Sequence, residues 1–254
     1  MTVSSAKPFS ASDPILSLDV GDVHLWFCHS QEILGDADSD TFKRNVLSRY
    51  AAIAPGEWRF ARGPHGKPRL QEAPVALDFN LSHSGDWLCC AVTGGMPVGI
   101  DIEFCNPQRD LAVVARRFFQ AGEVLDLDSG PPAGTVERFY EYWTLKEADI
   151  KSRGEALGPQ LEQVGFTLTG QEVSALSPLR ITRLSSPPAG PDAFYLLLEP
   201  APDYRVAACL LTDKGLVPRL GTFELCEDGS AGTLPARLLG ASGDIAWRAP
   251  AREK

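Results

Sequence analysis

The chain has 254 residues, of which 44% are apolar, and it carries a formal net charge of −9. Its size and apolar content argue against disorder and allow a substantial core, as one large domain or two small ones. The negative charge argues against broad adhesion to nucleic acid or to an anionic membrane, so a polyanionic ligand would need a local cluster of Lys and Arg.

The cysteines and the N-terminal residues indicate a cytoplasmic protein. None of the six cysteines forms a C-x-x-C pair, and no His stands at zinc-finger spacing, so reduced, mostly buried thiols are expected. Residues 1–13 are polar, and no apolar run approaches the roughly 18 residues that a membrane span needs. We therefore expect neither a membrane nor a nucleic-acid partner.

The first half of the chain predicts a strand, a helix and then three strands. Residues 22–28 are rich in β-branched and aromatic side chains, and residues 40–52 place apolar side chains at helical spacing. A basic, turn-rich passage at residues 58–70 follows. The three later strands, which imply a sheet, are expected at residues 75–82, 87–93 and 97–104.

The second half predicts helices and then four strands. A short helix at residues 111–120 and a Gly/Pro loop at 126–134 precede a longer helix through residues 139–151 that should end at Gly154. Strands are expected at residues 164–169, 179–184, 193–198 and 205–211. A helix followed by strands thus occurs before and after Cys105, which indicates a weakly repeated α+β unit.

This pattern divides the chain into three parts. We expect an N-terminal α+β half at residues 1–105 and a C-terminal α+β half at residues 106–214. Residues 215–254 are rich in Gly, Ala and Pro, so we expect a loosely structured extension there.

Two acidic side chains share one face of the third predicted strand. In Gly99-Ile100-Asp101-Ile102-Glu103, residues two apart point the same way, so Asp101 and Glu103 project together while the isoleucines anchor the opposite face. Magnesium is commonly held by one or two carboxylates and substrate phosphates, so the pair is a plausible half-site. A strand that alternates acid with isoleucine is nevertheless usually just a solvated face.

The long helix carries a third acid. Trp143, Glu147 and Lys151 stand four residues apart and share one side of the helix, and Lys146 adds a second amine. The ordinary interpretation is a half-buried helix with a weak Glu–Lys pair at its surface. Together with the acidic strand, however, the helix offers metal ligands, a possible base and a cation for phosphate oxygens, which are the groups that phosphoryl-type transfer needs.

Two shorter motifs are ambiguous alone. His83 stands in Asn80-Leu81-Ser82-His83-Ser84 at the end of a strand, where a lone His is more often exposed or structural than functional. A hydrolase triad is disfavoured because the chain has no G-x-S-x-G elbow. Gly66-Lys67-Pro68 is too short for a Walker A loop.

Taken in chain order, the four motifs strongly resemble those of the surfactin-type 4'-phosphopantetheinyl transferases of the holo-acyl-carrier-protein synthase superfamily. The motifs are residues 66–68, 80–84, 99–103 and 143–151. The resemblance spans roughly residues 23–211. It implies an α+β fold of two similar halves related by a pseudo-twofold axis, with the active site between them. It also implies transfer of phosphopantetheine from coenzyme A to a serine of an acyl or peptidyl carrier protein, with release of adenosine 3',5'-bisphosphate, by a monomer.

The same resemblance assigns roles to particular residues. It implies Mg²⁺ ligands at Asp101, Glu103 and Glu147, with Glu147 also the base toward the incoming serine. Lys151, also assigned to catalysis, and His83 would contact the phosphates of coenzyme A. The remaining expected positions are Lys67, Pro68 and Ser82 for coenzyme A, and Leu111, Val114 and Phe118 for carrier docking.

Two alternatives stay open. Family members usually carry a longer basic passage before the first helix that grips the 3'-phosphate, whereas residues 30–40 here are short and acidic, with only Lys43 and Arg44 nearby. This difference favours a degenerate member that binds carriers or nucleotides without transferring anything. A magnesium-dependent phosphoesterase that uses water as acceptor is the other alternative.

Overall fold

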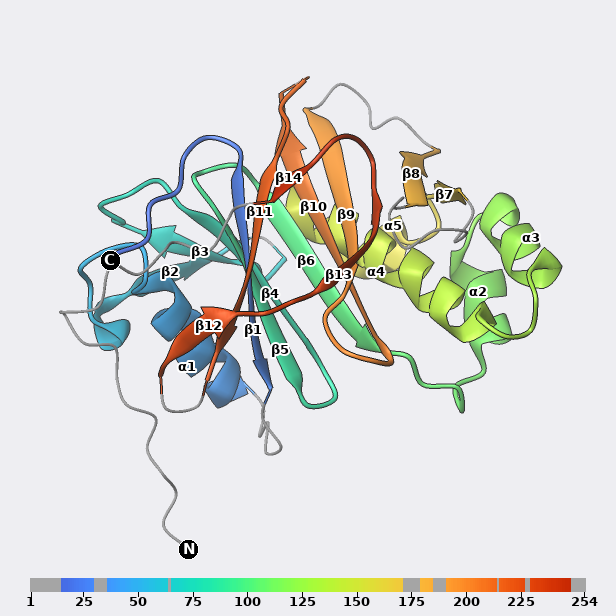
Figure 1. Cartoon of the computed structure of the whole chain (residues 1–254), viewed down its shortest axis with the longest axis horizontal. Coiled ribbons are helices and arrows are strands. Elements are labelled where there is room, and N and C mark those ends of the chain that lie inside the picture. The colour runs from blue at the N-terminus through green and yellow to red at the C-terminus, as the bar shows by residue number, and fades with distance from the viewer. Residues whose placement is uncertain are drawn as a thin grey trace, which may run out of the picture.

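The protein has a mixed α+β fold in which two large sheets pack face to face (Figure 1). The computed structural model describes residues 15–29, 36–63, 65–170, 179–184, 191–213, 215–226 and 229–247. Within these residues, no helix is both long and apolar enough to cross a membrane.

The first sheet has the strand order β12-β11-β1-β5-β4, with β14 paired to β11. Its strands are β1 (Asp22–His29), β4 (Asp78–Ser84), β5 (Trp87–Thr93), β11 (Arg219–Leu225), β12 (Ala231–Thr233) and β14 (Ala246–Trp247). A separate small sheet pairs β2 (Arg59–Arg62) with β3 (Pro68–Gln71).

The second sheet has the order β6-β10-β9-β13-β8-β7, so β6 is one of its edges. Its strands are β6 (Val98–Phe104), β7 (Phe166–Thr169), β8 (Leu179–Arg183), β9 (Asp192–Glu199), β10 (Tyr204–Thr212) and β13 (Arg237–Ala241). The helices are α1 (Asp36–Leu47), α2 (Leu111–Phe118), α3 (Ala121–Ser129), α4 (Thr135–Arg153) and α5 (Leu157–Gln160), together with the 3-10 turn η1 (Pro55–Glu57).

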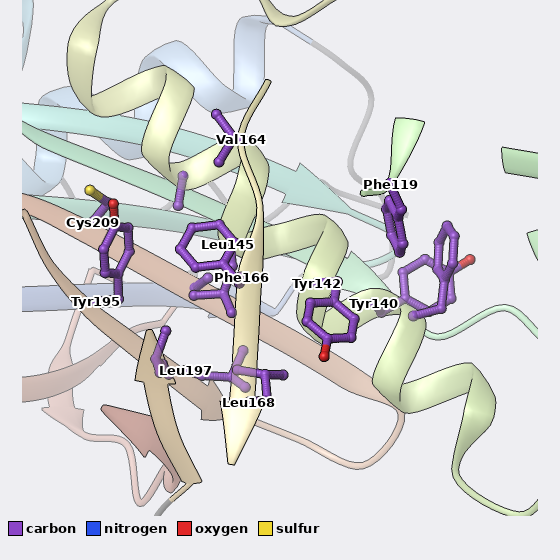
Figure 2. Close-up of a cluster of buried hydrophobic side chains, with 14 of the residues drawn as sticks. Phe119, Tyr140, Tyr142, Leu145, Val164, Phe166, Leu168, Tyr195, Leu197 and Cys209 are labelled. Carbon is purple, nitrogen blue, oxygen red and sulfur yellow. The ribbon is translucent and has the colours of Figure 1, made fainter. Parts of the chain in front are cut away.

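Three hydrophobic clusters separate four layers. One lies between α1 and the outer face of the first sheet, where Trp26 of β1 meets Val46 and Leu47. The second lies between the two sheets and includes Ile100 and Ile102 of β6. The third packs α4 against the far face of the second sheet, and Figure 2 shows side chains of α4, β7 and β9 meeting in it. The alternation of each strand between two clusters follows from its period of two.

Most of the predicted elements form, with small shifts at their ends. The strand at residues 87–93 has the expected bounds, and the long helix ends at Gly154, which adopts the left-handed conformation at φ 67°. The loop expected at residues 126–134 is wrong in its first part, because α3 continues to Ser129. The carboxylate of Glu123 accepts the N–H of Gln120 at 2.7 Å and caps this helix, and Val124 and Leu127 pack against the core.

The C-terminal segment differs from the loosely structured extension expected at residues 215–254. Strand β11 pairs in parallel with β1, whereas β13 inserts between β9 and β8 of the other sheet. Val217 and Trp247 are about half exposed, at 48% and 50%, but several other apolar residues of this segment are buried, including Leu220 at 0% exposure and Leu239 at 8%. Their burial within established sheets outweighs the high Gly and Pro content that suggested a loose structure.

Candidate active site

The acidic face of β6 lies against α4. Because Ile100 and Ile102 fill the space between the sheets, Asp101 and Glu103 point to the other side of the strand, toward the helix. Gly99 permits a close approach: a Cβ atom there would lie 2.1 Å from the carbonyl oxygen of Ala148 and 2.4 Å from the amide nitrogen of Ser152. Strand and helix therefore sit closer than any larger residue at position 99 would allow.

This approach brings the three predicted carboxylates together. One oxygen from each of Asp101, Glu103 and Glu147 lies within 4.8 Å of the others, which is the grouping expected from the sequence. Asp101 is buried, while the two glutamates are half-buried. We call these three residues the acidic cluster.

Lys151 is the cation of the acidic cluster. Its Nζ lies 2.6 Å from Asp101 Oδ1 and 3.2 Å from Glu147 Oε2, one helical turn earlier, and its side chain is 21% exposed. It also donates to Ser82 Oγ at 3.2 Å, and that hydroxyl donates to Asp101 Oδ1 at 2.7 Å. Four residues of the predicted site, Ser82, Asp101, Glu147 and Lys151, thus form one connected network.

Burial and crowding of like charges shift the pKa values in the acidic cluster. Burial raises the pKa of Asp101 well above its ordinary value, and the neighbouring glutamates add to the effect while Lys151 opposes it. Burial also raises the pKa of Glu103, against the hydrogen bond from Ser84. Burial lowers the pKa of Lys151, but Asp101 and Glu147 more than offset it, and the net direction is upward. The ammonium group of Lys151 therefore balances the charge of three carboxyl groups, which are costly to ionise together.

These residues fit a divalent cation. Asp101 is 2% exposed, and its Oδ1 accepts from both Lys151 and Ser82. Its Oδ2 is buried and has no hydrogen-bond partner among the described residues. A buried carboxylate oxygen without a partner is costly, and a bound cation would satisfy it. Oxygen atoms of carboxylates are the ligands that Mg²⁺ prefers.

Strand β4 joins the acidic strand through side chains instead of a backbone ladder. The N–H groups of Val98, Ile100 and Phe104, all on the edge strand β6, donate to side chains of β4. The accepting side chains are Asp78 at 3.1 Å, Asn80 at 2.8 Å and Ser84 at 3.0 Å. Because Ser82 also donates a hydrogen bond to Asp101, every second residue of β4 from 78 to 84 is hydrogen-bonded to β6. We call this contact the β4–β6 seam, and the pattern of residues in the sequence did not predict it.

The other predicted coenzyme A residues are more dispersed. Lys67 donates to the Val98 carbonyl at 2.8 Å and lies 3.7 Å from Asp78, and burial lowers its pKa. Pro68 begins β3 and is half-buried. His83 is exposed, and strand alternation turns it away from the face that carries Ser82 and its seam partners.

The second amine of the helix lies elsewhere. Lys146 is fully buried, with its Nζ 2.7 Å from Glu123 Oε2, and it donates to the carbonyl oxygens of Leu161 and Val164. It is one residue from Glu147 and therefore points about 100° away around the helix. Lys146 therefore lies away from the acidic cluster, and it ties α4 to α3 and to the chain before β7.

The predicted carrier-docking residues lie on α2. Leu111, Val114 and Phe118 are half-buried, because they pack against the cluster around α4. Val113 on the same helix is 59% exposed, and Leu125 on α3 is 67% exposed. Helical spacing alone did not distinguish the residues that anchor α2 from those that remain at its surface.

The basic residues near the first helix are already paired. Lys43 and Arg44 lie 2.6 Å and 2.5 Å from the two carboxylate oxygens of Asp40. Arg44 also donates to the Trp58 carbonyl at 2.8 Å. Residues 30–35 of the acidic segment lie outside the described residues.

Two of the hollows that the described residues form beside α4 differ in their relation to the acidic cluster. One of about 470 Å³ shares Glu103 and Ser84 with the acidic region and is also lined by Arg109 and Tyr140. A second of about 390 Å³ lies at the start of α4 and contains no member of the acidic cluster. The first hollow therefore offers a larger molecule room beside Glu103.

Comparison with known proteins agrees with this geometry. A family model described as the 4'-phosphopantetheinyl transferase superfamily matches residues 97–209, the range that contains the whole acidic cluster and Lys151. The transferase HetI of Nostoc sp. strain PCC 7120 is 35% identical over 179 residues, which is 69% of this chain and 70% of the relative. The transferase Sfp of Bacillus subtilis strain 168 is 30% identical over 183 residues, 72% of this chain and 76% of the relative.

A relative from another group of bacteria agrees: the transferase AcpT of Salmonella typhi is 31% identical over 153 residues, 60% of this chain and 76% of the relative. The relatives are named 4'-phosphopantetheinyl transferases, so the predicted class of enzyme is confirmed. The chain belongs to the 4'-phosphopantetheinyl transferase superfamily.

Proposed function

We propose that this protein transfers the 4'-phosphopantetheine moiety of coenzyme A to a serine of an acyl or peptidyl carrier protein, in the manner of the surfactin-type enzymes. The observation that carries the proposal is the acidic cluster, in which three carboxylates from a strand and a later helix meet beside Lys151. Adenosine 3',5'-bisphosphate is the expected second product.

The acidic cluster would hold a magnesium ion. When bound, Mg²⁺ would neutralise charge on the pyrophosphate oxygens of coenzyme A. Asp101 would contribute the buried oxygen that has no partner among the described residues. Glu103 and Glu147 would complete the protein's share of the ligands.

The protein's own residues would supply the other catalytic functions. Lys151 keeps its proton at neutral pH, because its acidic neighbours raise its pKa, and it would hold a phosphate oxygen as a fixed cation. Glu147, half-buried on α4, would accept the proton of the incoming serine hydroxyl, which is a poor nucleophile without a base. The exposed His83 would contact a phosphate of coenzyme A, and Lys67, Pro68 and Ser82 would lie on the nucleotide side.

Carrier docking is assigned to α2. Leu111, Val114 and Phe118 would shape the docking helix from its half-buried side, and the exposed Val113 would meet the carrier. The hollow of about 470 Å³ beside Glu103 offers room for the part of a substrate that continues beyond the phosphates.

The protein would be a monomer built from two similar α+β halves that meet near residue 105. The first half would supply α1 with β1, β4 and β5 of one large sheet, and the second half α4 with β7 to β10 of the other, while β6 of the first half joins the second sheet. A pseudo-twofold axis would relate the two halves. The six cysteines are free thiols, which supports a reducing compartment such as the cytoplasm.

One experiment separates this function from its alternatives. The protein is incubated with coenzyme A, Mg²⁺ and apo forms of acyl and peptidyl carrier proteins, and intact masses are measured. Transfer adds the phosphopantetheine mass to a carrier and releases adenosine 3',5'-bisphosphate. Hydrolysis of coenzyme A with an unchanged carrier would indicate the phosphoesterase instead.

A degenerate member is the second candidate, and the pairing of Lys43 and Arg44 with Asp40 favours it. These cations are engaged within the protein and would bind a 3'-phosphate less readily. We therefore expect weak binding of coenzyme A, and a dissociation constant below about 1 μM in calorimetry would contradict this expectation. Binding of coenzyme A or a carrier without any mass transfer would identify the degenerate member.

A further inference from the structure

Ser84 occupies a defined place beside the acidic cluster. It lies at the end of β4, two residues beyond Ser82, and the two hydroxyls contact successive acids of β6. Ser82 Oγ lies 2.7 Å from Asp101 Oδ1, and Ser84 Oγ lies 3.0 Å from Glu103 Oε2. The β4–β6 seam thus gives each acid of the strand its own serine.

The hydrogen bonds of Ser84 determine the direction of its proton. A serine hydroxyl has one proton and two lone pairs. Because the N–H of Phe104 donates to Ser84 Oγ at 3.0 Å, a lone pair faces that amide and the proton is free to point to Glu103. This amide belongs to Phe104, the residue directly after Glu103. The backbone of β6 therefore orients the hydroxyl group that donates to the carboxylate of Glu103 on the same strand.

Glu103 depends on Ser84 more than Asp101 depends on Ser82. Asp101 is buried, and both Lys151 and Ser82 donate to its Oδ1. Glu103 has a longer side chain and lies at the edge of the hollow of about 470 Å³. Among the described residues, Ser84 is the one hydrogen-bond donor to its carboxylate. Without that donor, the side chain would have several rotamers open to it.

We propose that Ser84 is a positioning residue that holds Glu103 in the geometry of a metal ligand. The inference rests on the proposed function, because it takes the acidic cluster as the magnesium site. Partners of metal-ligating carboxylates commonly change metal affinity by about 10- to 100-fold when they are removed. Ser84 would act in this way without touching the ion.

The test measures binding of Mn²⁺ alone, as a substitute for Mg²⁺, to the full-length protein by calorimetry. Ser84→Ala removes the hydroxyl, and Ser84→Thr and Ser84→Val form a matched pair of equal shape that differs in the hydroxyl. Ser129→Ala, on α3, is the control for loss of a serine elsewhere. We expect about 10- to 100-fold weaker binding in the Ala and Val variants and near-native binding in the Thr and control variants. The unfolding temperature of the metal-free variants should stay close to native.

The possible results distinguish a failure of the role proposed for Ser84 from a failure of the proposed metal site. Native protein that binds Mn²⁺ no more tightly than Val or Ala variants would overturn the role of Ser84 while leaving the metal site in place. Equal affinities of the Thr and Val variants would do the same even if Ser84→Ala does not fold. Native protein that binds no Mn²⁺ would overturn the metal site itself, and the inference with it.

Discussion

Gly99→Ala is the change that tests most directly whether the approach of β6 to α4 creates the site. The added Cβ would lie 2.1 Å from the carbonyl oxygen of Ala148, whereas ordinary contacts begin at 3.4 Å. Strand and helix would have to separate by about 1.3 Å, and overpacking of this kind typically costs about 1–3 kcal/mol of stability. Asp101 and Glu147 lie on the two elements that move apart, so the acidic cluster would open.

The catalytic effect should exceed the effect on stability. A misplacement of about 1 Å in a catalytic arrangement can lower the rate about 100-fold. Transfer is measured as the mass added to an apo carrier, and the free energy of unfolding is measured in urea. The control is Gly122→Ala in α3, where a Cβ would meet nothing within 4 Å and helix propensity should improve. A Gly99→Ala protein with native rate and native Mn²⁺ affinity would refute the reasoning.

Glu147→Gln keeps the side-chain shape but removes the proposed base and a metal ligand, so transfer should fall at least about 100-fold with the fold intact. Lys151→Ala should raise the KM for coenzyme A, measured in steady-state assays. Lys146→Met leaves the buried Glu123 carboxylate without its cation and should cost about 3–5 kcal/mol in urea unfolding. Burial raises the pKa of Asp101 and a metal binds the ionised carboxylate, so protons should compete with the metal and Mn²⁺ affinity in calorimetry should fall as pH falls.

Each of these predictions has a result that would contradict it. Near-native transfer by the Gln variant would end the assignment of Glu147, and an unchanged KM would do so for Lys151. If Glu123→Leu combined with Lys146→Met is no more stable than Lys146→Met alone, the cost does not come from an unpaired charge. Mn²⁺ affinity that is independent of pH from about pH 5 to about pH 8 would show that no carboxyl group gives up a proton on binding.

The chemistry of the site was predictable because it depends on short-range periodicity. Alternation along a strand placed Asp101 and Glu103 on one face, and four-residue spacing placed Glu147 beside Lys151 on a helix. The strand and the helix come from distant parts of the chain, and their contact was predicted from the family resemblance and not from either pattern. Gly99, which makes the contact possible, carried no distinctive signal beyond being a glycine within a strand.

The β4–β6 seam shows what sequence patterns omit. Asp78, Asn80, Ser82 and Ser84 alternate as a polar face of β4, which would ordinarily indicate exposure to solvent. In the structure this face meets the edge of another sheet, where backbone N–H groups require acceptors. Similarly, Lys146 and Glu123 are both charged, yet they are buried together because tertiary contacts bring them into one ion pair.

The parallel pairing of β1 with β11 has a consequence for how the protein is made. Arg219, at the start of β11, donates to Asp22 at the start of β1 across 197 residues of sequence. On the ribosome, β1 must wait for the 197 residues that separate Asp22 from Arg219 before its neighbour begins to form. Contacts between such distant residues slow folding, and the open strand edge invites association meanwhile. Assembly of the sheet that carries the two site serines is thus completed only after β11 has been made.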